Sequence, residues 1–159
     1  MQRLQCHYIN RGGDKAQLDQ IVKHLGERQQ FIENAEGKYG ALCIFPEGAC
    51  NNGLYLNKFR RGAFAAERAI QPYIMTYDWE MTSPGYDAVK GIHTGMLMAS
   101  EFSMKTIRLD VFPNFVPNEY LFTEYRKTIP GGEKLERWEV YAHAVRDFIS
   151  ETGGFGLND

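Results

Sequence analysis

Long hydrophobic runs are missing from this chain of 159 residues. No apolar run approaches the roughly 20 residues that a membrane-spanning helix needs, and residues 1–15 are too polar for a secretory signal peptide. We therefore expect that, if the protein works at a membrane, a partner, a surface patch or a segment outside this sequence holds it there.

Cysteine pairs and strong net charge are also missing. The three cysteines are odd in number and form no C-x-x-C motif, which is typical of reduced thiols in a non-oxidising compartment. The histidines have no metal-ligand spacing, so no metal site is expected. A formal net charge of -2 provides no basic field that would recruit nucleic acid, and any anion must be bound by a local cluster.

The composition that is present is that of a folded domain. Hydrophobic residues make up 43% of the chain and charged residues 24%, both ordinary for a globular protein. The length suits one hydrophobic core, and neither an internal repeat nor a low-complexity linker divides the chain. We expect residues 1–159 to form a single domain.

The order of the predicted elements is that of an α/β protein. A helix should begin at the N-cap Asp14 and end near Gly26, and a second helix should span 133–150 and end at Gly153 and Gly154. Apolar runs predict strands at 39–45, 72–77 and 106–112, after a short strand around Tyr8 and Ile9. A continuous run such as 41–45 is typical of parallel strands covered on both faces. The expected fold is a mixed, largely parallel sheet flanked by helices.

Several apolar side chains are assigned to packing rather than to chemistry. Trp138 and Tyr141 lie on the apolar stripe of the second helix and should belong to the core. Met96 and Met98 are expected to be buried by packing, with an acyl groove as the alternative. Cys50 has no histidine near it in the sequence and is interpreted as an inert turn cysteine.

The segment with the clearest chemistry is the turn Phe45-Pro46-Glu47-Gly48 and the basic stretch that follows it. Proline at the second position and glycine at the fourth favour a type I turn at the end of the predicted strand. In open α/β sheets, ligands bind beyond the carboxyl ends of the strands. Lys58, Arg60 and Arg61 follow, and such side chains bind phosphate through charge-assisted hydrogen bonds. Taken singly, each motif is more often a plain turn or a solvated surface.

In combination and in this order, these motifs resemble the glycerol-phosphate and lysophospholipid acyltransferase family. Phe45-Pro46-Glu47-Gly48, a polar turn and then the basic stretch with Gly62-Ala63-Phe64 look like the family's third sequence block. Tyr8-Ile9-Asn10-Arg11 is similar to its second block, and Ile70 to Ile74 to its fourth. The resemblance covers residues 5–80 and implies a partial glycerolipid acyltransferase fold. It also implies that acceptor lipid is bound by a set of six residues: Arg11, Glu47, Gly48, Lys58, Arg60 and Arg61.

The family's catalytic His-x-x-x-x-Asp motif does not occur in this sequence. The residues five positions after the four histidines are Gly12, Gln29, Met98 and Phe148. His143 and Asp147 are four apart in the predicted helix and are interpreted as a surface pair. We therefore assign no catalytic residue, because the family's general base would lie upstream of Met1.

Three interpretations of the missing base stay open: a truncated enzyme, one half of a split enzyme, and a degenerate domain kept as a structural subunit that still holds a lipid. The resemblance implies phospholipid or lysophospholipid, a membrane surface and further protein subunits or an N-terminal partner chain as partners. It implies no cofactor, with acyl-CoA as co-substrate if the protein is active. The expected location is the reducing side of an endoplasmic reticulum or mitochondrial membrane.

Overall fold

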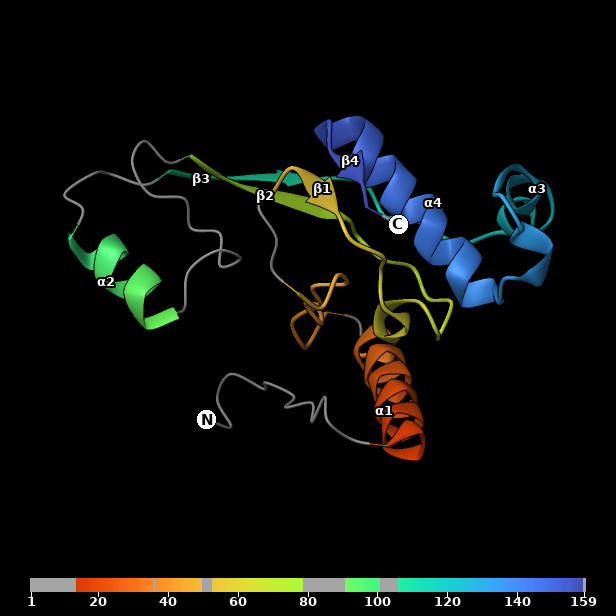
Figure 1. Ribbon diagram of the computed structural model, residues 1–159. Coiled ribbons are helices and arrows are strands. Elements are labelled where there is room, and N and C mark those ends of the chain that lie inside the picture. The colour runs from red at the N-terminus through yellow and green to blue at the C-terminus, as the bar shows by residue number, and fades with distance from the viewer. Residues whose placement is uncertain (1–13, 36, 50–52, 79–90, 101–105, 159) are drawn as a thin grey trace.

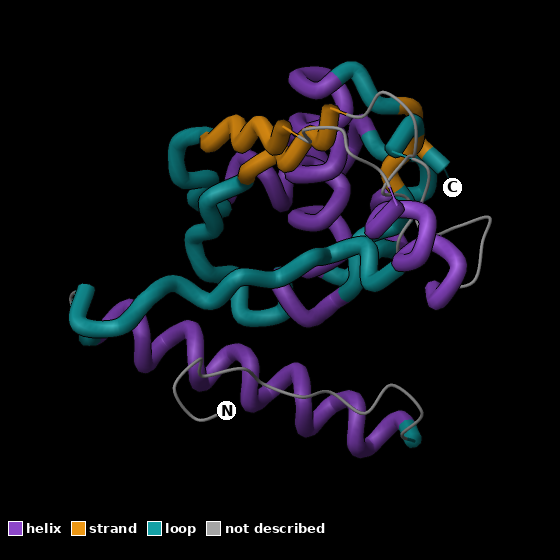
Figure 2. Tube along the Cα trace, turned by 90° about the vertical axis from the view of Figure 1, so that its left-hand side faces the viewer, coloured by secondary structure: helices purple, strands orange, loops and turns teal. Residues whose placement is uncertain are grey.

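A computed structural model describes residues 14–35, 37–49, 53–78, 91–100 and 106–158. Its helices and strands form a mixed α/β arrangement in which α1 lies apart from the other long helix, α4 (Figures 1 and 2). The longer elements, in chain order, are α1 (Lys15–Asn34), β2 (Tyr73–Asp78), α2 (Gly91–Ser100), β3 (Thr106–Val111) and α4 (Arg137–Gly153). The shorter ones are β1 (Tyr55–Leu56), η2 (Arg61–Ala63), η3 (Leu121–Tyr125), α3 (Arg126–Thr128), η4 (Gly132–Lys134) and β4 (Gly156–Leu157).

Helix α1 begins as the sequence predicts and continues further than expected. The Asp14 side chain accepts a hydrogen bond from the Gln17 backbone N–H at 2.8 Å, which caps the first turn. Gly26 does not end the helix. A Cβ atom there would lie 3.3 Å from the Cβ of Ala66, so this glycine allows the loop after η2 to approach the helix closely. The polar residues that follow are good helix formers and extend α1 to Asn34.

The strands form two separate pairs. β2 and β3 are antiparallel, with Tyr73 opposite Val111 and Asp78 opposite Thr106. The expected mixed arrangement is present, but its longer pair of strands is antiparallel rather than parallel. The parallel pair is instead β1 with β4, where Tyr55 faces Gly156 and Leu56 faces Leu157. Two-residue strands leave no periodic pattern in a sequence, so this pair was not predicted.

The segment 39–45 is not a strand, although its apolar run predicted one. Its residues form no ladder with another described strand, and their side chains alternate between half-buried and exposed. Ile44 packs against the core, whereas the side chain of Phe45 is 71% exposed. A contact between Cys43 Sγ and the Tyr73 hydroxyl links the segment to β2. An apolar run becomes a strand only when another backbone pairs with it.

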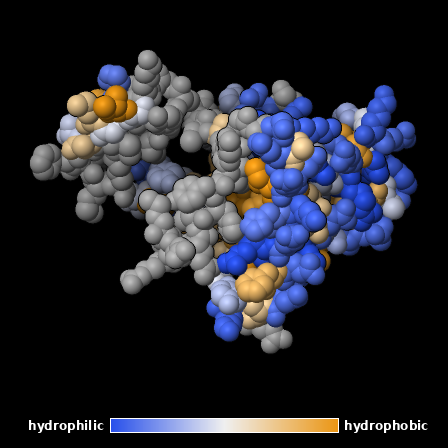
Figure 3. Space-filling model, turned by 90° about the horizontal axis from the view of Figure 1, so that it is seen from below, coloured by the Kyte–Doolittle hydropathy of each residue, from blue (hydrophilic) through white to orange (hydrophobic). Residues whose placement is uncertain are grey.

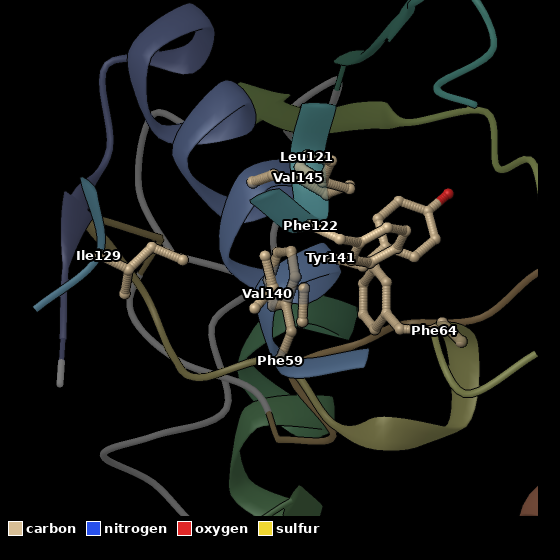
Figure 4. Packing of buried hydrophobic residues seen from close by; sticks show 11 residues of the cluster. Phe59, Phe64, Leu121, Phe122, Ile129, Val140, Tyr141 and Val145 are labelled. Carbon is tan, nitrogen blue, oxygen red and sulfur yellow. The ribbon is translucent and has the colours of Figure 1, made fainter. Parts of the chain in front are cut away.

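Helix α4 carries the main core. It begins at a capping box formed by Glu136 and Glu139 and ends at Gly154, whose φ of 70° suits a glycine. Tyr141 is fully buried and packs edge-on against Phe64 at 5.3 Å between ring centroids (Figure 4). Its hydroxyl lies 2.9 Å from the Arg68 carbonyl oxygen. The core role predicted for Tyr141 is confirmed, and Trp138 packs partly buried against the same cluster.

Two further expectations concern the surface. Met96 lies on α2 with 68% of its surface exposed, so its predicted burial is wrong. Apolar side chains of α2 are visible at the left of the space-filling view (Figure 3). The surface on the right of the same view is mostly hydrophilic. The expected strand at Tyr8 and Ile9, Cys50 and the side chain of Met98 lie outside what the structure describes.

Candidate functional site

The turn at Phe45–Gly48 is bonded directly to the start of the basic stretch. The Gly48 N–H donates to the Phe45 carbonyl at 3.4 Å, which closes the turn predicted from Pro46 and Gly48. The Arg60 N–H donates to the Pro46 carbonyl at 2.8 Å. Residues 45–48 and 57–60 therefore lie side by side, as a joint ligand site requires.

Gly48 allows this close approach. Its φ is +69°, in the left-handed region that favours glycine. A Cβ atom at this position would lie 3.3 Å from Cγ of Arg60 and would crowd that side chain. The glycine thus serves both the turn and the path of the Arg60 side chain across it.

The Glu47 carboxylate faces the backbone of the segment after β1. Its Oε2 accepts a hydrogen bond from the Asn57 backbone N–H at 2.9 Å. This bond joins the acidic residue of the turn to the residue after β1. The carboxylate is half-buried at this point.

The basic side chains separate into two groups. Lys58 and Arg60 are exposed, and within the described residues neither side chain has an ion-pair or hydrogen-bond partner. Arg61 differs, because its Nη1 lies 2.8 Å from Oδ1 of Asp19 on α1. The structure thus brings Glu47, Gly48 and Arg60 together, with Lys58 in the adjoining segment, and places the Arg61 guanidinium against α1. Arg11 lies outside the described residues.

A shallow hollow of about 430 Å³ is lined by residues that include Arg61, Glu67, Arg126 and Arg137. Its arginines are already engaged. Arg126 donates to the carbonyl oxygens of Gly132 at 2.8 Å and Glu133 at 3.1 Å, and Arg137 is paired with Glu67 at 2.9 Å. Because many of their N–H donors are already used within the fold, fewer remain for an anion, so this hollow is the weaker candidate site.

The residues of the expected surface pair in α4 do not act together. Asp147 accepts a hydrogen bond from the Tyr125 hydroxyl instead of meeting His143. Burial and this bond raise the pKa of Tyr125.

Among the residues that the structure describes, no group of three His, Cys, Asp or Glu side chains could hold a metal ion. No described helix is both long and apolar enough to cross a membrane.

A comparison with known proteins finds a family match that covers this segment. A sequence model of the family described as Acyltransferase matches residues 1–77, which include the turn and the basic stretch. Residues 1–77 are thus similar to the acyltransferase family. No solved structure matches the chain significantly.

The curated relatives are lysophospholipid acyltransferases. Lysophospholipid acyltransferase LPEAT1 of Arabidopsis thaliana is 26% identical over 98% of this chain and 35% of its own length. Human lysophosphatidylcholine acyltransferase 1 is 24% identical over 92% of this chain and 24% of its own length. Human LPCAT4 is 32% identical over 45% of this chain. The chain thus spans about a third or less of the length of these relatives.

Three polar residues near the turn were not predicted from the sequence as part of the site. Hydrogen bonds of 3.1 Å or less connect Glu47 to α4 through Asn57, Arg146 and Asn158. Arg146 had a recognisable signal. It lies four residues after Ala142 and three before Ile149, so a charge interrupts an apolar helix face. Asn57 and Asn158 carry no comparable pattern.

Proposed function

We propose that this chain supplies the phosphate-binding side of a lysophospholipid acyltransferase site. The observation that carries the proposal is the bonded pair of segments 45–48 and 57–60, with the exposed cations Lys58 and Arg60. A guanidinium and an ammonium group beside a glycine turn suit the phosphate of an acceptor lipid. The family match to this segment and the names of the relatives support the same substrate class.

Catalysis is a separate part of the proposal. Acyl transfer requires a base to take the proton of the acceptor hydroxyl while its oxygen attacks the acyl thioester carbon and the thiolate leaves. The sequence holds no His-x-x-x-x-Asp motif, and loss of a general base typically lowers a rate by about 10²–10⁴. We propose an acyltransferase-like domain that is not catalytic by itself and acts as an accessory or structural subunit retaining a phospholipid.

A second candidate is part of an active, acyl-CoA-dependent lysophospholipid or glycerol-3-phosphate acyltransferase. The observation in its favour is the much greater length of the relatives, of which this chain matches about a third or less. An acyl-CoA turnover assay on the purified polypeptide and on its native assembly separates the candidates. Turnover in the assembly alone favours the second, whereas no turnover in either favours a structural role.

Lipid binding tests the phosphate site itself. The probe is lysophosphatidic acid in phosphatidylcholine vesicles, and the variant is Lys58→Ala with Arg60→Ala. We expect binding about tenfold weaker, because charge-assisted hydrogen bonds are lost, and a smaller difference at high salt because exposed charges are screened. Lys127→Ala is the control, since it removes an exposed cation paired with Glu124 on another segment. Equal binding by the double variant and the wild type overturns the site.

Membrane association is also proposed, in keeping with the lipid substrate. Ile92 and Met96 on α2 are 72% and 68% exposed, and exposed apolar patches mark interaction surfaces. Ile92→Ser with Met96→Ser should weaken flotation with phosphatidylcholine vesicles that contain no lysophospholipid. Val116→Ser, at a 62% exposed position elsewhere, is the control. Unaltered flotation of the double variant counts against α2 as the contact with lipid.

A further inference from the structure

Arg146 is a charged residue in the interior of the molecule. Only 2% of its surface is exposed, because it lies on the buried side of α4 with the core residues Ala142 and Val145. Taking a guanidinium out of water is costly unless it is hydrogen-bonded. The hydrogen-bond partners of its Nη2 atom therefore indicate the role of this residue.

Those partners lie at the ends of the two strands of the parallel pair. Nη2 of Arg146 donates to the carbonyl oxygen of Leu56, at the end of β1, at 2.7 Å. The same nitrogen lies 2.7 Å from the carbonyl oxygen of Asn158, which follows β4. The Asn158 N–H also donates to the Leu56 carbonyl, at 3.0 Å. One buried cation thus spans the pair and secures it to α4.

The peptide group between Leu56 and Asn57 extends this network to the candidate site. Its carbonyl end accepts from Arg146 and Asn158, and its N–H end donates to Oε2 of Glu47 at 2.9 Å. The peptide is planar and trans, so fixing the direction of its C=O fixes the direction of its N–H. The Asn158 side chain adds a bond of 3.1 Å to Oδ1 of Asn57.

The charges at the two ends favour the same orientation. A peptide dipole has its negative end at the oxygen and its positive end at the N–H. Here the guanidinium faces the oxygen and the carboxylate faces the N–H, so both polarise the group in the same sense. An N–H polarised in this way is a stronger donor to Glu47.

We propose that Arg146 is a positioning residue for Glu47, acting through the single peptide group that joins Leu56 to Asn57. The proposal rests on the proposed function only for the role of Glu47 in the lipid site. It assigns a task to the chain beyond residues 1–77, the segment that the family model matches. The C-terminal helix and strand hold the acidic residue of the turn in place.

The test reads the Asn57 amide by NMR in the full chain without any ligand. Arg146→Met should lower the hydrogen-exchange protection of this amide about tenfold, as expected for one weakened hydrogen bond, and shift its proton resonance upfield. Glu47→Gln should shift it in the same direction. Arg126→Met is the matched control, because Arg126 also donates to backbone carbonyls but not in this network.

Two results overturn the proposal. One is an unchanged Asn57 amide in a folded Arg146→Met variant, and the other is an equal loss of protection in Arg126→Met, which would report only global stability. If Arg146→Met does not fold, Asn158→Ala removes the exposed side chain of the network and should speed Asn57 exchange about twofold to threefold. Unchanged exchange in that variant also overturns the proposal. The vesicle assay of Lys58 and Arg60 tests the lipid site separately, since the amide is read without lipid.

Discussion

Glu67 and Arg137 form a two-pronged ion pair that joins the loop after η2 to the first turn of α4. Nε of Arg137 lies 3.0 Å from each carboxylate oxygen, and Nη2 lies 2.9 Å from Oε2. The Arg137 guanidinium also stacks 3.7 Å above the Phe122 ring centroid. The hydrogen bond to Glu67 raises the pKa of Arg137. Glu67 adopts φ +48°, a left-handed conformation that costs a residue with a side chain roughly 1–3 kcal/mol.

Glycine and alanine at position 67 should therefore reverse their usual order of stability. Both Glu67→Gly and Glu67→Ala lose the ion pair, but only glycine adopts φ +48° without strain, so Glu67→Gly should be more stable by about 1 kcal/mol. Thermal unfolding of the two variants measures the difference. The control is Glu27 within α1, where glycine should be less stable than alanine by about 1 kcal/mol. If the alanine variant is more stable than the glycine variant at both positions, then residue 67 is not left-handed.

Local signals account for the parts of the fold that the sequence predicted well. The N-cap Asp14, the glycine end of α4 and the stripe with Tyr141 each depend on neighbours within one or two helical turns. The mixed α/β class followed from the order of such elements. The turn at Phe45–Gly48 was likewise found from proline and glycine alone.

Pairing between distant segments accounts for what the sequence did not predict. The apolar run 39–45 lacks a described strand partner, and β1 and β4 are too short to leave a pattern. Arg61 looked equivalent to Arg60, and only the position of Asp19 on α1 separates them. Gly26 resembled a helix end because its contact with Ala66 is not visible in a sequence.

Alkaline pH should destabilise the fold through Tyr73. Burial and then the contact with Cys43 raise the pKa of Tyr73 to about 12, from an ordinary value near 10.0. The unfolded chain therefore releases this proton at a lower pH than the folded chain does. The contribution of Tyr73 to the stability is fully present below pH 10.0 and is lost as the pH rises toward about 12.

Tyr73→Phe tests this linkage. Urea unfolding measured at several alkaline pH values should show a shallower loss of stability in the variant, because one linked proton is removed. Tyr77→Phe is the control, as an exposed tyrosine on the same strand. Parallel curves for wild type and Tyr73→Phe would remove Tyr73 as a source of the pH dependence.

Gly48→Ala should damage the candidate site as well as the turn. The alanine would need a φ near +69°, at a cost of about 1–2 kcal/mol, and its Cβ would crowd Cγ of Arg60. Gly37→Ala is the matched control, because Gly37 has φ +82° but no atom within 4 Å of the added Cβ. Both variants should lower the melting temperature, and only Gly48→Ala should also weaken binding to lysophosphatidic acid vesicles. Equal lipid binding by the two would place Arg60 outside the lipid contact.

Arg61 should contribute to stability rather than to lipid binding. Its guanidinium lies 2.8 Å from Asp19, with side-chain exposures of 45% and 51%, so the pair should be worth no more than about 1 kcal/mol. Arg61→Ala should lower the unfolding free energy by that amount and leave vesicle binding unchanged, whereas Arg60→Ala weakens binding. A double-mutant cycle with Asp19→Ala isolates the pair energy. If Arg61→Ala weakens lipid binding as much as Arg60→Ala and the cycle shows no coupling, then Arg61 leaves α1 in solution and belongs to the phosphate site, as its sequence position implied.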